Sequence, residues 1–433
     1  MKQTLHKNKL LHRMGFVLLL IALTLTSIGA SSPVQYEQKS TTTQIAFSNY
    51  LATQENTDLS DDEKIKAAID AYFASRYEGQ KVLEQQDFSP LLDDDTLDWV
   101  KKEKDKREIE LYVASLFDLS YETYSYTLDY LSIEVKNKKA IVQLLESHEV
   151  VFKAISPEIS KMANLQHIIT LHYKKGVWVI YKDEYQDELS YQIDNLSKED
   201  IKKQVDENYQ EDVKRKENSH NLGGKVLASL SLQPLGLTAI TYNRTAAWQY
   251  ADYYWNNSVF SPYYRFDPSG NNCANFVAQA INAGLTNSSP TTAPVATAMG
   301  PQGTYSSSGG DANWGQQWYY KFNTYNSSYA LAYSASYAWI NTVGQYSFIT
   351  TNNWTKGPTG ASTTNLCSMR AGDVVQIKLG STYDHEGIVV SLLGACTLSN
   401  FLIDAHTTPR YHYPLSNWST YPMRYLRVTG GYK

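Results

Sequence analysis

A cysteine at the start of an expected helix is the residue of this sequence best suited to chemistry. Residues 267–272 are turn and cap residues, and the apolar side chains after Cys273 recur on one helix face up to Gly284, the expected C-terminal cap. This arrangement puts Cys273 near the positive end of a helix dipole, where the thiolate is favoured. Cys273 is therefore a candidate nucleophile, and the alternative is a buried, inert cysteine on an apolar helix face.

A cysteine nucleophile needs a base, and the second half of the chain offers three histidines, His385, His406 and His412. His385 begins an apolar run that is expected to form a strand. On the next expected strand Asp404 and His406 lie two residues apart and so share a face, and either could orient the imidazole of His385. The pattern predicts acyl transfer through a Cys273 thioester with His385 as the base.

The groups that would stabilise the oxyanion are only partly indicated by the sequence. The backbone N–H of Cys273 is one expected donor, because it lies at the start of the helix. The second donor stays open among Asn272, Tyr263 and Tyr264. This mechanism needs no metal and no cofactor. The histidines of the first half have no metal-ligand spacing, so we expect them to be ordinary sheet residues: His148, His167 and His172.

The other two cysteines, Cys367 and Cys396, flank two expected strands. If these strands pair with Lys378 opposite His385, the two cysteines face each other at the open end of the hairpin, at a separation that suits a disulfide. A slip of one residue would spoil this register, so pairing and free thiols both remain open. A disulfide would leave Cys273 as the one free thiol.

The first 31 residues have the pattern of a signal peptide. Basic residues precede a short apolar run over 16–23, which gives way to small and polar residues and is short for a membrane span. We therefore expect export, with no membrane association after cleavage; the alternative is an uncleaved anchor. The net charge of −5 provides no basic surface for nucleic acid.

The composition of the chain changes sharply near its middle. Residues 55–220 are dense in Lys, Glu and Asp, whereas Glu386 is the only glutamate after Thr241 and that half is rich in Tyr, Asn, Ser, Thr and Trp. Such a change predicts separate domains. The expected order is a polar leader over 32–55, a first domain over 56–185, a charged helix and linker over 186–240, and a second domain over 241–433.

The first domain shows helical periodicity followed by strand periodicity. A capping box at Ser60 begins one helix, and a second runs from about 95 to 119. Two hairpins follow, over 124–152 and 167–181. The order resembles the cone-shaped α+β fold of nuclear-transport-factor-like and SnoaL-like domains. Its role stays open between an inhibitory pro-region, a wall- or partner-binding module and a spacer.

The second domain begins with helices and ends with strands. We expect helices over 242–255 and after residue 267, a long surface loop over 286–313, and short helices over 314–320 and 337–343. Four strands are expected over 372–378, 384–391, 401–406 and 425–428. An α+β domain with Cys on a helix and His on an antiparallel sheet is the layout of papain-like hydrolases.

Several short motifs of this half resemble the putative amidase domains of secreted bacterial proteins, relatives of the CHAP and NlpC-type peptidases. They are Tyr-Asn-Arg-Thr-Ala-Ala at 242–247, Asn-Cys-Ala-Asn-Phe-Val-Ala-Gln at 272–279, Gly-Asp-Val-Val-Gln at 372–376, Asp-His-Glu-Gly-Ile-Val-Val-Ser at 384–391 and Ala-His-Thr-Thr at 405–408. The resemblance implies that Cys273 is the nucleophile, His385 the base and His406 its orienter. Asn272 and Ala274 depart from the Asp and Thr that the family usually has.

The resemblance and the expected export together imply a cell-wall substrate. Peptidoglycan is the first candidate, cleaved at a stem-peptide bond or at the sugar–peptide amide. A tyrosine- and tryptophan-rich, weakly charged surface suits neutral glycans. The alternative function is a cell-wall-binding module of the same fold with little or no activity.

Overall fold

The structure is a computed structural model that describes residues 43–218, 236–256, 272–290, 318, 336–352 and 355–433. It is a mixed α+β structure, as expected, built on one 11-stranded sheet. The strands follow the order β1-β2-β3-β10-β9-β8-β7-β11-β5, with β4 on β3 and β6 on β11. The expected signal peptide lies outside the described residues.

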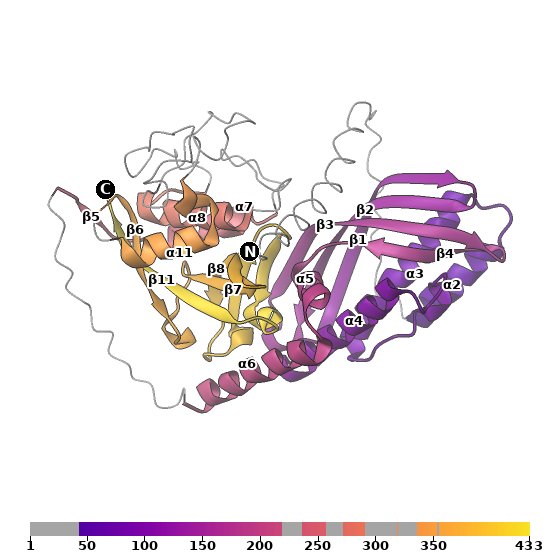
Figure 1. Ribbon diagram of the computed structural model, residues 1–433, viewed down its shortest axis with the longest axis horizontal. Coiled ribbons are helices and arrows are strands. Elements are labelled where there is room, and N and C mark those ends of the chain that lie inside the picture. Colours follow the sequence, from indigo (N-terminus) through magenta and orange to yellow (C-terminus); the bar gives the residue numbers. More distant parts are fainter. Residues whose placement is uncertain (1–42, 219–235, 257–271, 291–317, 319–335, 353–354) are drawn as a thin grey trace, which may run out of the picture. The chain divides into compact units, whose positions relative to one another are not determined.

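The first half of the chain folds helices onto an antiparallel sheet (Figure 1). Its helices are α2 (Thr43–Glu55), α3 (Asp61–Val82) and α4 (Asp98–Phe117), and its strands are β1 (Tyr121–Lys136), β2 (Lys139–Phe152), β3 (Ile159–Lys174) and β4 (Val177–Glu184). The expected capping box of Ser60 with Glu63 begins α3. Both expected hairpins are confirmed, since β1 pairs with β2 and β3 with β4.

The expectation of a polar leader over 32–55 is wrong for residues 43–55, because these residues form the helix α2. Tyr50 of this helix is buried, and its hydroxyl donates a hydrogen bond of 3.1 Å to the carbonyl of Trp178 on β4. Phe47 also packs against the core, and Gln54 accepts from the backbone N–H of Trp178, so several side chains dock this polar helix. Composition alone did not reveal these contacts.

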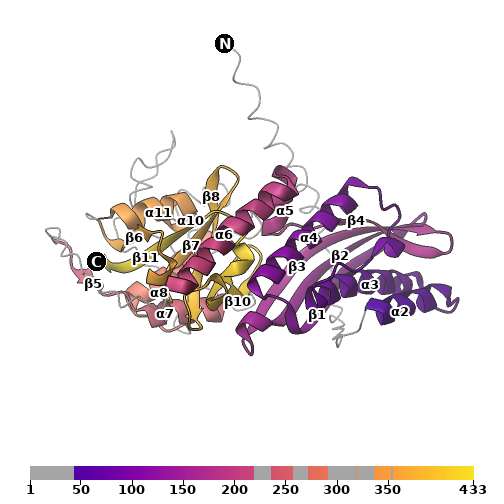
Figure 2. The ribbon, with the colours of Figure 1, turned by 90° about the horizontal axis from the view of Figure 1, so that it is seen from below.

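The charged segment after β4 is packed against the rest of the protein and does not form a solvated linker. It contains α5 (Glu188–Asn195) and α6 (Lys198–Asn218), and α6 lies beside α4 (Figure 2). Ile201 and Val205 are fully buried. Asn208 donates to the carbonyls of Ser419 and Tyr421. These contacts hold α5 and α6 against the second half of the chain.

The second half packs helices against the strands β6, β8 and β11 (Figure 1). Its helices are α7 (Arg244–Tyr254), α8 (Asn272–Thr286), α10 (Tyr337–Ile340) and α11 (Thr342–Thr351). Its strands are β5 (Ala239–Ile240), β6 (Gly357–Thr363), β7 (Val374–Leu379), β8 (Thr382–Leu392), β9 (Phe401–Ala405), β10 (Arg410–Pro414) and β11 (Met423–Tyr432). The four predicted strands are present, and β5, β6 and β10 were not predicted.

The strand β10 joins the two halves into one sheet. Arg410 pairs with Met162 and Tyr411 with Lys161, so β10 continues the sheet from β3. On its other side β10 pairs with β9. The change in composition near residue 241 therefore does not separate two sheets.

Two local expectations are corrected by the structure. Ile377, not Lys378, lies opposite His385, so the predicted register of β7 and β8 was wrong by one residue. Gly284 does not end α8, which continues to Thr286. A Cβ at Gly284 would lie 2.3 Å from a ring carbon of Tyr242, so close packing explains this glycine. Within the described residues, no helix has the length and apolarity required to cross a membrane.

Candidate active site

The helix α8 places Cys273 in its first turn, as expected from the sequence. Every residue of α8 except Thr286 is buried, because this apolar helix packs between α7, α10 and the sheet. Cys273 is 5% exposed, and its thiol donates to the carbonyl of Asp384 over 3.8 Å. The nucleophile candidate therefore lies against the start of β8.

A buried chain of hydrogen bonds fixes the N-terminus of α8. The indole of Trp339 donates to Asn275, which donates to the Oδ1 of Asn272, over 3.0 and 2.9 Å. The Nδ2 of Asn272 in turn donates to Nδ1 of His406 over 2.9 Å. The ring of His406 stacks on Phe276 with 3.9 Å between centroids, and its Nε2 donates to the carbonyl of Tyr254. This network sets the position of Cys273.

The structure brings Cys273 and His385 together. His385 lies on β8, is 5% exposed, and packs edge-on against the ring of Trp418. Burial lowers the pKa of His385, but the adjacent Cys273 thiol and Glu188 carboxylate outweigh burial and raise the pKa to about 10. A protonated imidazole beside the thiol is therefore the favoured state at neutral pH.

Glu188 also lies beside the His385 ring. Its Oε1 lies 3.6 Å from Nε2 of His385, which is an ion-pair distance and longer than a direct hydrogen bond. Neither atom has a hydrogen-bond partner among the described residues. Burial raises the pKa of Glu188, but Arg410 and His385 outweigh it and lower the pKa to about 2. The carboxylate is therefore charged at neutral pH.

The start of α5 holds Glu188 in place. Asp187 caps the helix by accepting from the N–H of Ser190, and Lys106 of α4 bonds Asp187 over 2.7 Å. Arg410 of β10 donates to Oε2 of Glu188 over 3.1 Å, and the hydroxyl of Tyr421 donates to its backbone carbonyl. Sequence reasoning missed Glu188 because it treated this segment as solvated. The capping pair Asp187 and Ser190 was the available signal that a helix begins there.

The two residues expected to orient His385 lie elsewhere. Gly387 pairs with Ala405 and Ile388 with Asp404, so Asp404 lies on the face of Ile388. By strand alternation, His385 points to the opposite face. His406 has both ring nitrogens engaged, with Asn272 and with the Tyr254 carbonyl. The expectation that Asp404 or His406 orients His385 is therefore wrong. The carboxylate next to the His385 ring is that of Glu188.

The structure describes two of the expected oxyanion donors, the backbone N–H of Cys273 and the side chain of Asn272. The N–H of Cys273 lies in the first turn of α8, where backbone donors have no intrahelical acceptor. The side chain of Asn272 is engaged with His406 and Asn275, so its role here is to hold the helix. Tyr263 and Tyr264 lie outside the described residues.

Cys367 and Cys396 form a disulfide with 5.3 Å between their Cα atoms. Cys367 lies in a short 3-10 helix, Leu366–Ser368, before β7, and the pair forms although the register of β7 and β8 differs by one residue from the one considered above. Cys273 is the free cysteine of the chain.

One of the comparisons with known proteins found a match. No curated protein and no solved structure matches the chain. Residues 241–428 match the family model described as putative amidase domain, which implies hydrolysis of an amide bond. The match includes Cys273 and His385 and excludes Glu188. Residues 241–428 therefore resemble a putative amidase domain, and the same sheet continues into a first half that the family model does not cover.

Proposed function

We propose that the protein is a cysteine-dependent amide hydrolase whose site is made by Cys273, His385 and Glu188. The observation that carries the proposal is the buried group of these three side chains, in which the imidazole of His385 interacts with both the Cys273 thiol and the Glu188 carboxylate. A helix carrying the cysteine against an antiparallel sheet carrying the histidine is also the layout of papain-like hydrolases. The match to the amidase family model independently favours an amide substrate.

The reaction begins with attack of the Cys273 thiolate on the amide carbonyl. The N–H of Cys273 stabilises the oxygen anion that forms. The imidazolium of His385 then gives its proton to the leaving amine, and the acyl group remains on sulfur as a thioester. Neutral His385 next takes a proton from water, which attacks the thioester and releases the acid. The proton on His385 and the thiolate are then restored.

Glu188 acts as a positioning residue in this mechanism. Since Nε2 of His385 faces the carboxylate, the other ring nitrogen is left for the thiol. The negative charge of Glu188 stabilises the imidazolium that must be present before the leaving amine is protonated. Arg410 keeps Glu188 charged and oriented through its 3.1 Å hydrogen bond.

Peptidoglycan is the substrate we propose, and the exterior of the cell or the cell wall is the proposed location. The support is the signal-peptide pattern of the first 31 residues together with the aromatic, weakly charged composition after residue 241. The bond is an amide in a stem peptide or between sugar and peptide.

The experiment that tests this function is digestion of purified peptidoglycan by residues 33–433, with released fragments identified by mass spectrometry. New amine and carboxyl ends should appear with the wild type and be lost in both Cys273→Ala and His385→Ala. The chemical identity of the new ends also shows which amide bond is cleaved. A matched control is His172→Ala, which removes a half-buried histidine that pairs with Asp93. His172 lies on β3, which β10 and β9 separate from the strand β8 that carries His385.

A binding module is the competing function, and the same experiment separates the two. Sedimentation of the protein with peptidoglycan, without release of fragments by any variant, would identify a wall-binding domain. Release that persists in Cys273→Ala would reject the cysteine mechanism while keeping the hydrolase.

A further inference from the structure

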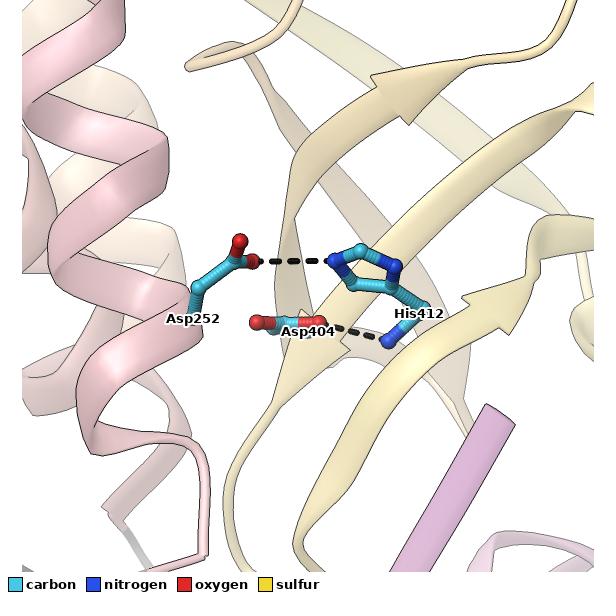
Figure 3. A group of neighbouring side chains, drawn as sticks. All are labelled: Asp252, Asp404 and His412. Carbon is cyan, nitrogen blue, oxygen red and sulfur yellow. Dashed lines mark hydrogen bonds and ion pairs between the residues drawn. The ribbon is translucent and has the colours of Figure 1, made fainter. Parts of the chain in front are cut away.

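Three side chains from three elements converge on the side of β9 that faces α7 (Figure 3). Asp252 comes from α7, Asp404 from β9 and His412 from β10, and one ligand atom of each lies within 4.8 Å of the other two. His412 Nε2 lies 3.2 Å from Asp252 Oδ1. Ligand atoms held about 2.0–2.1 Å from a tetrahedral zinc ion lie roughly 3.3 Å apart, so this pair already has the spacing of two zinc ligands.

The side chain of Asp404 independently indicates that this cluster is suited to a cation. Its side chain is fully buried. Oδ1 accepts a 2.7 Å hydrogen bond from the backbone N–H of His412, whereas Oδ2 has no hydrogen-bond partner among the described residues. A buried carboxylate oxygen without a donor is costly, and here it points toward the carboxylate of Asp252. A cation between the two carboxylates would supply the partner that this oxygen lacks.

The second ring nitrogen of His412 is held as it is in many metal sites. Nδ1 lies 2.5 Å from Oε1 of Glu158, the residue just before β3. A histidine that binds metal through one nitrogen commonly donates the other N–H to a carboxylate, which fixes the tautomer. Here Glu158 would hold the proton on Nδ1 and leave the lone pair of Nε2 directed at Asp252. The left-handed backbone of His412, with φ of 50°, turns its N–H toward Asp404.

We propose that Asp252, Asp404 and His412 bind a divalent transition-metal ion, with zinc as the best match. Glu158 orients the His412 ring through its contact with Nδ1. Imidazole nitrogen with two carboxylates suits zinc, whereas calcium and magnesium prefer all-oxygen sites. The ion would connect α7 to the β9–β10 corner and, through Glu158, to the first half of the chain. Its role is structural and does not depend on the proposed hydrolase.

No sequence pattern indicated this site, because its ligands lie at positions 252, 404 and 412 without a recognisable spacing. Only the approach of α7 to the β9–β10 corner brings them together. The expectation that the reaction needs no metal is unaffected, since His385 and Cys273 lie in a different cluster.

The test is zinc binding by the full chain in a Cys273→Ala background, which removes the thiol as a competing ligand. The protein, purified without a metal-affinity tag, is loaded with zinc sulfate, gel-filtered and analysed for metal and by native mass spectrometry. We expect one zinc ion per chain and a rise in melting temperature on loading. Asp252→Asn and Asp404→Asn should lose the ion, and Glu158→Gln should bind about 10–100-fold more weakly.

The matched control is Asp93→Asn, which changes a histidine–carboxylate pair that lacks a second carboxylate, and it should keep the ion. Asp252 is partly exposed, so its variant should fold even if the buried Asp404 variant does not. Retention of zinc by the Asp252 variant equal to that of its parent, or no zinc on the parent after loading, would overturn the site.

Discussion

The carboxylate of Glu188 lies 3.6 Å from Nε2 of His385, although the two residues come from different halves of the chain. His385 belongs to the segment that matches the amidase family model, and Glu188 precedes that segment by more than fifty residues. The carboxylate reaches the imidazole because α5 docks on β10 and on Tyr421. A carboxylate from the first half of the chain, together with the Cys273 thiol, therefore raises the pKa of a buried histidine in the segment that matches the family model.

Replacing Glu188 with glutamine should lower hydrolysis and shift its pH dependence. The pKa of His385 is raised to about 10, so the wild type should keep its imidazolium until the pH rises through that value. Without the carboxylate, the pKa should fall toward the ordinary value of about 6.5, and kcat/KM above neutral pH should drop by about 10–100-fold. The measurement is the pH profile of kcat/KM.

A control for this variant is Glu110→Gln, which breaks a partly buried ion pair with Arg76 and leaves His385 untouched. It should lower stability without moving the alkaline limb of the profile. An alkaline limb at the wild-type position in Glu188→Gln would show that Glu188 has only a structural role.

Removing the first half of the chain should reduce activity. A chain of residues 241–433 lacks Glu188 and leaves β10 without its partner strand β3. We expect low hydrolysis by this fragment, with recovery when residues 43–218 are added in trans. Circular dichroism establishes first that the fragment is folded. Higher activity of a folded fragment would instead identify the first half as an inhibitory pro-region.

The oxidised protein should contain one titratable thiol. Cys367 and Cys396 are paired, so a thiol reagent applied after unfolding should count one thiol without reduction and three after reduction. Replacing both paired cysteines with alanine should lower the free energy of unfolding by about 2–4 kcal/mol, because the bond closes a loop of 29 residues in the unfolded chain. Three thiols before reduction would contradict the pairing.

Gly284→Ala should destabilise the protein through overpacking. The added Cβ would lie 2.3 Å from the ring of Tyr242, which is buried and donates to the carbonyl of Gly372. A loss of about 1–3 kcal/mol in the free energy of unfolding is expected, measured with denaturant. Thr286→Ala, at the end of the same helix, is the control and should change stability by less than about 0.5 kcal/mol. Equal effects of the two changes would mean that the helix end, and not Tyr242, determines the result.

Elements with strong periodicity could be predicted from the sequence, and the contacts between distant elements could not. The hairpin of β1 and β2 follows from alternation and from the turn at Asn137 and Lys138, both of which have positive φ. In contrast, β10 has no alternation of its own over Arg410–Pro414 and becomes a strand because β3 and β9 flank it. Composition also could not show that α2 and α6 are docked.

The same limit applies to the candidate site. Cys273 and His385 were identified from their positions on a helix and a strand, because those positions are local properties. The orienting group depended on the register of β8 and β9 and on the docking of α5, which are tertiary properties. Asp404 and His406 were therefore predicted to orient His385, whereas Glu188 lies in a charged stretch that was expected to be solvated.

The most direct test of the central claim is the rate at which iodoacetamide labels Cys273 as a function of pH, since it needs no substrate. Residues 33–433 are compared with His385→Ala and Glu188→Gln, and the labelled peptide is quantified by mass spectrometry. We predict fast labelling of the wild type at neutral pH, a large loss in His385→Ala, and an intermediate rate in Glu188→Gln. Equal rates in the wild type and His385→Ala would contradict activation of Cys273 by His385.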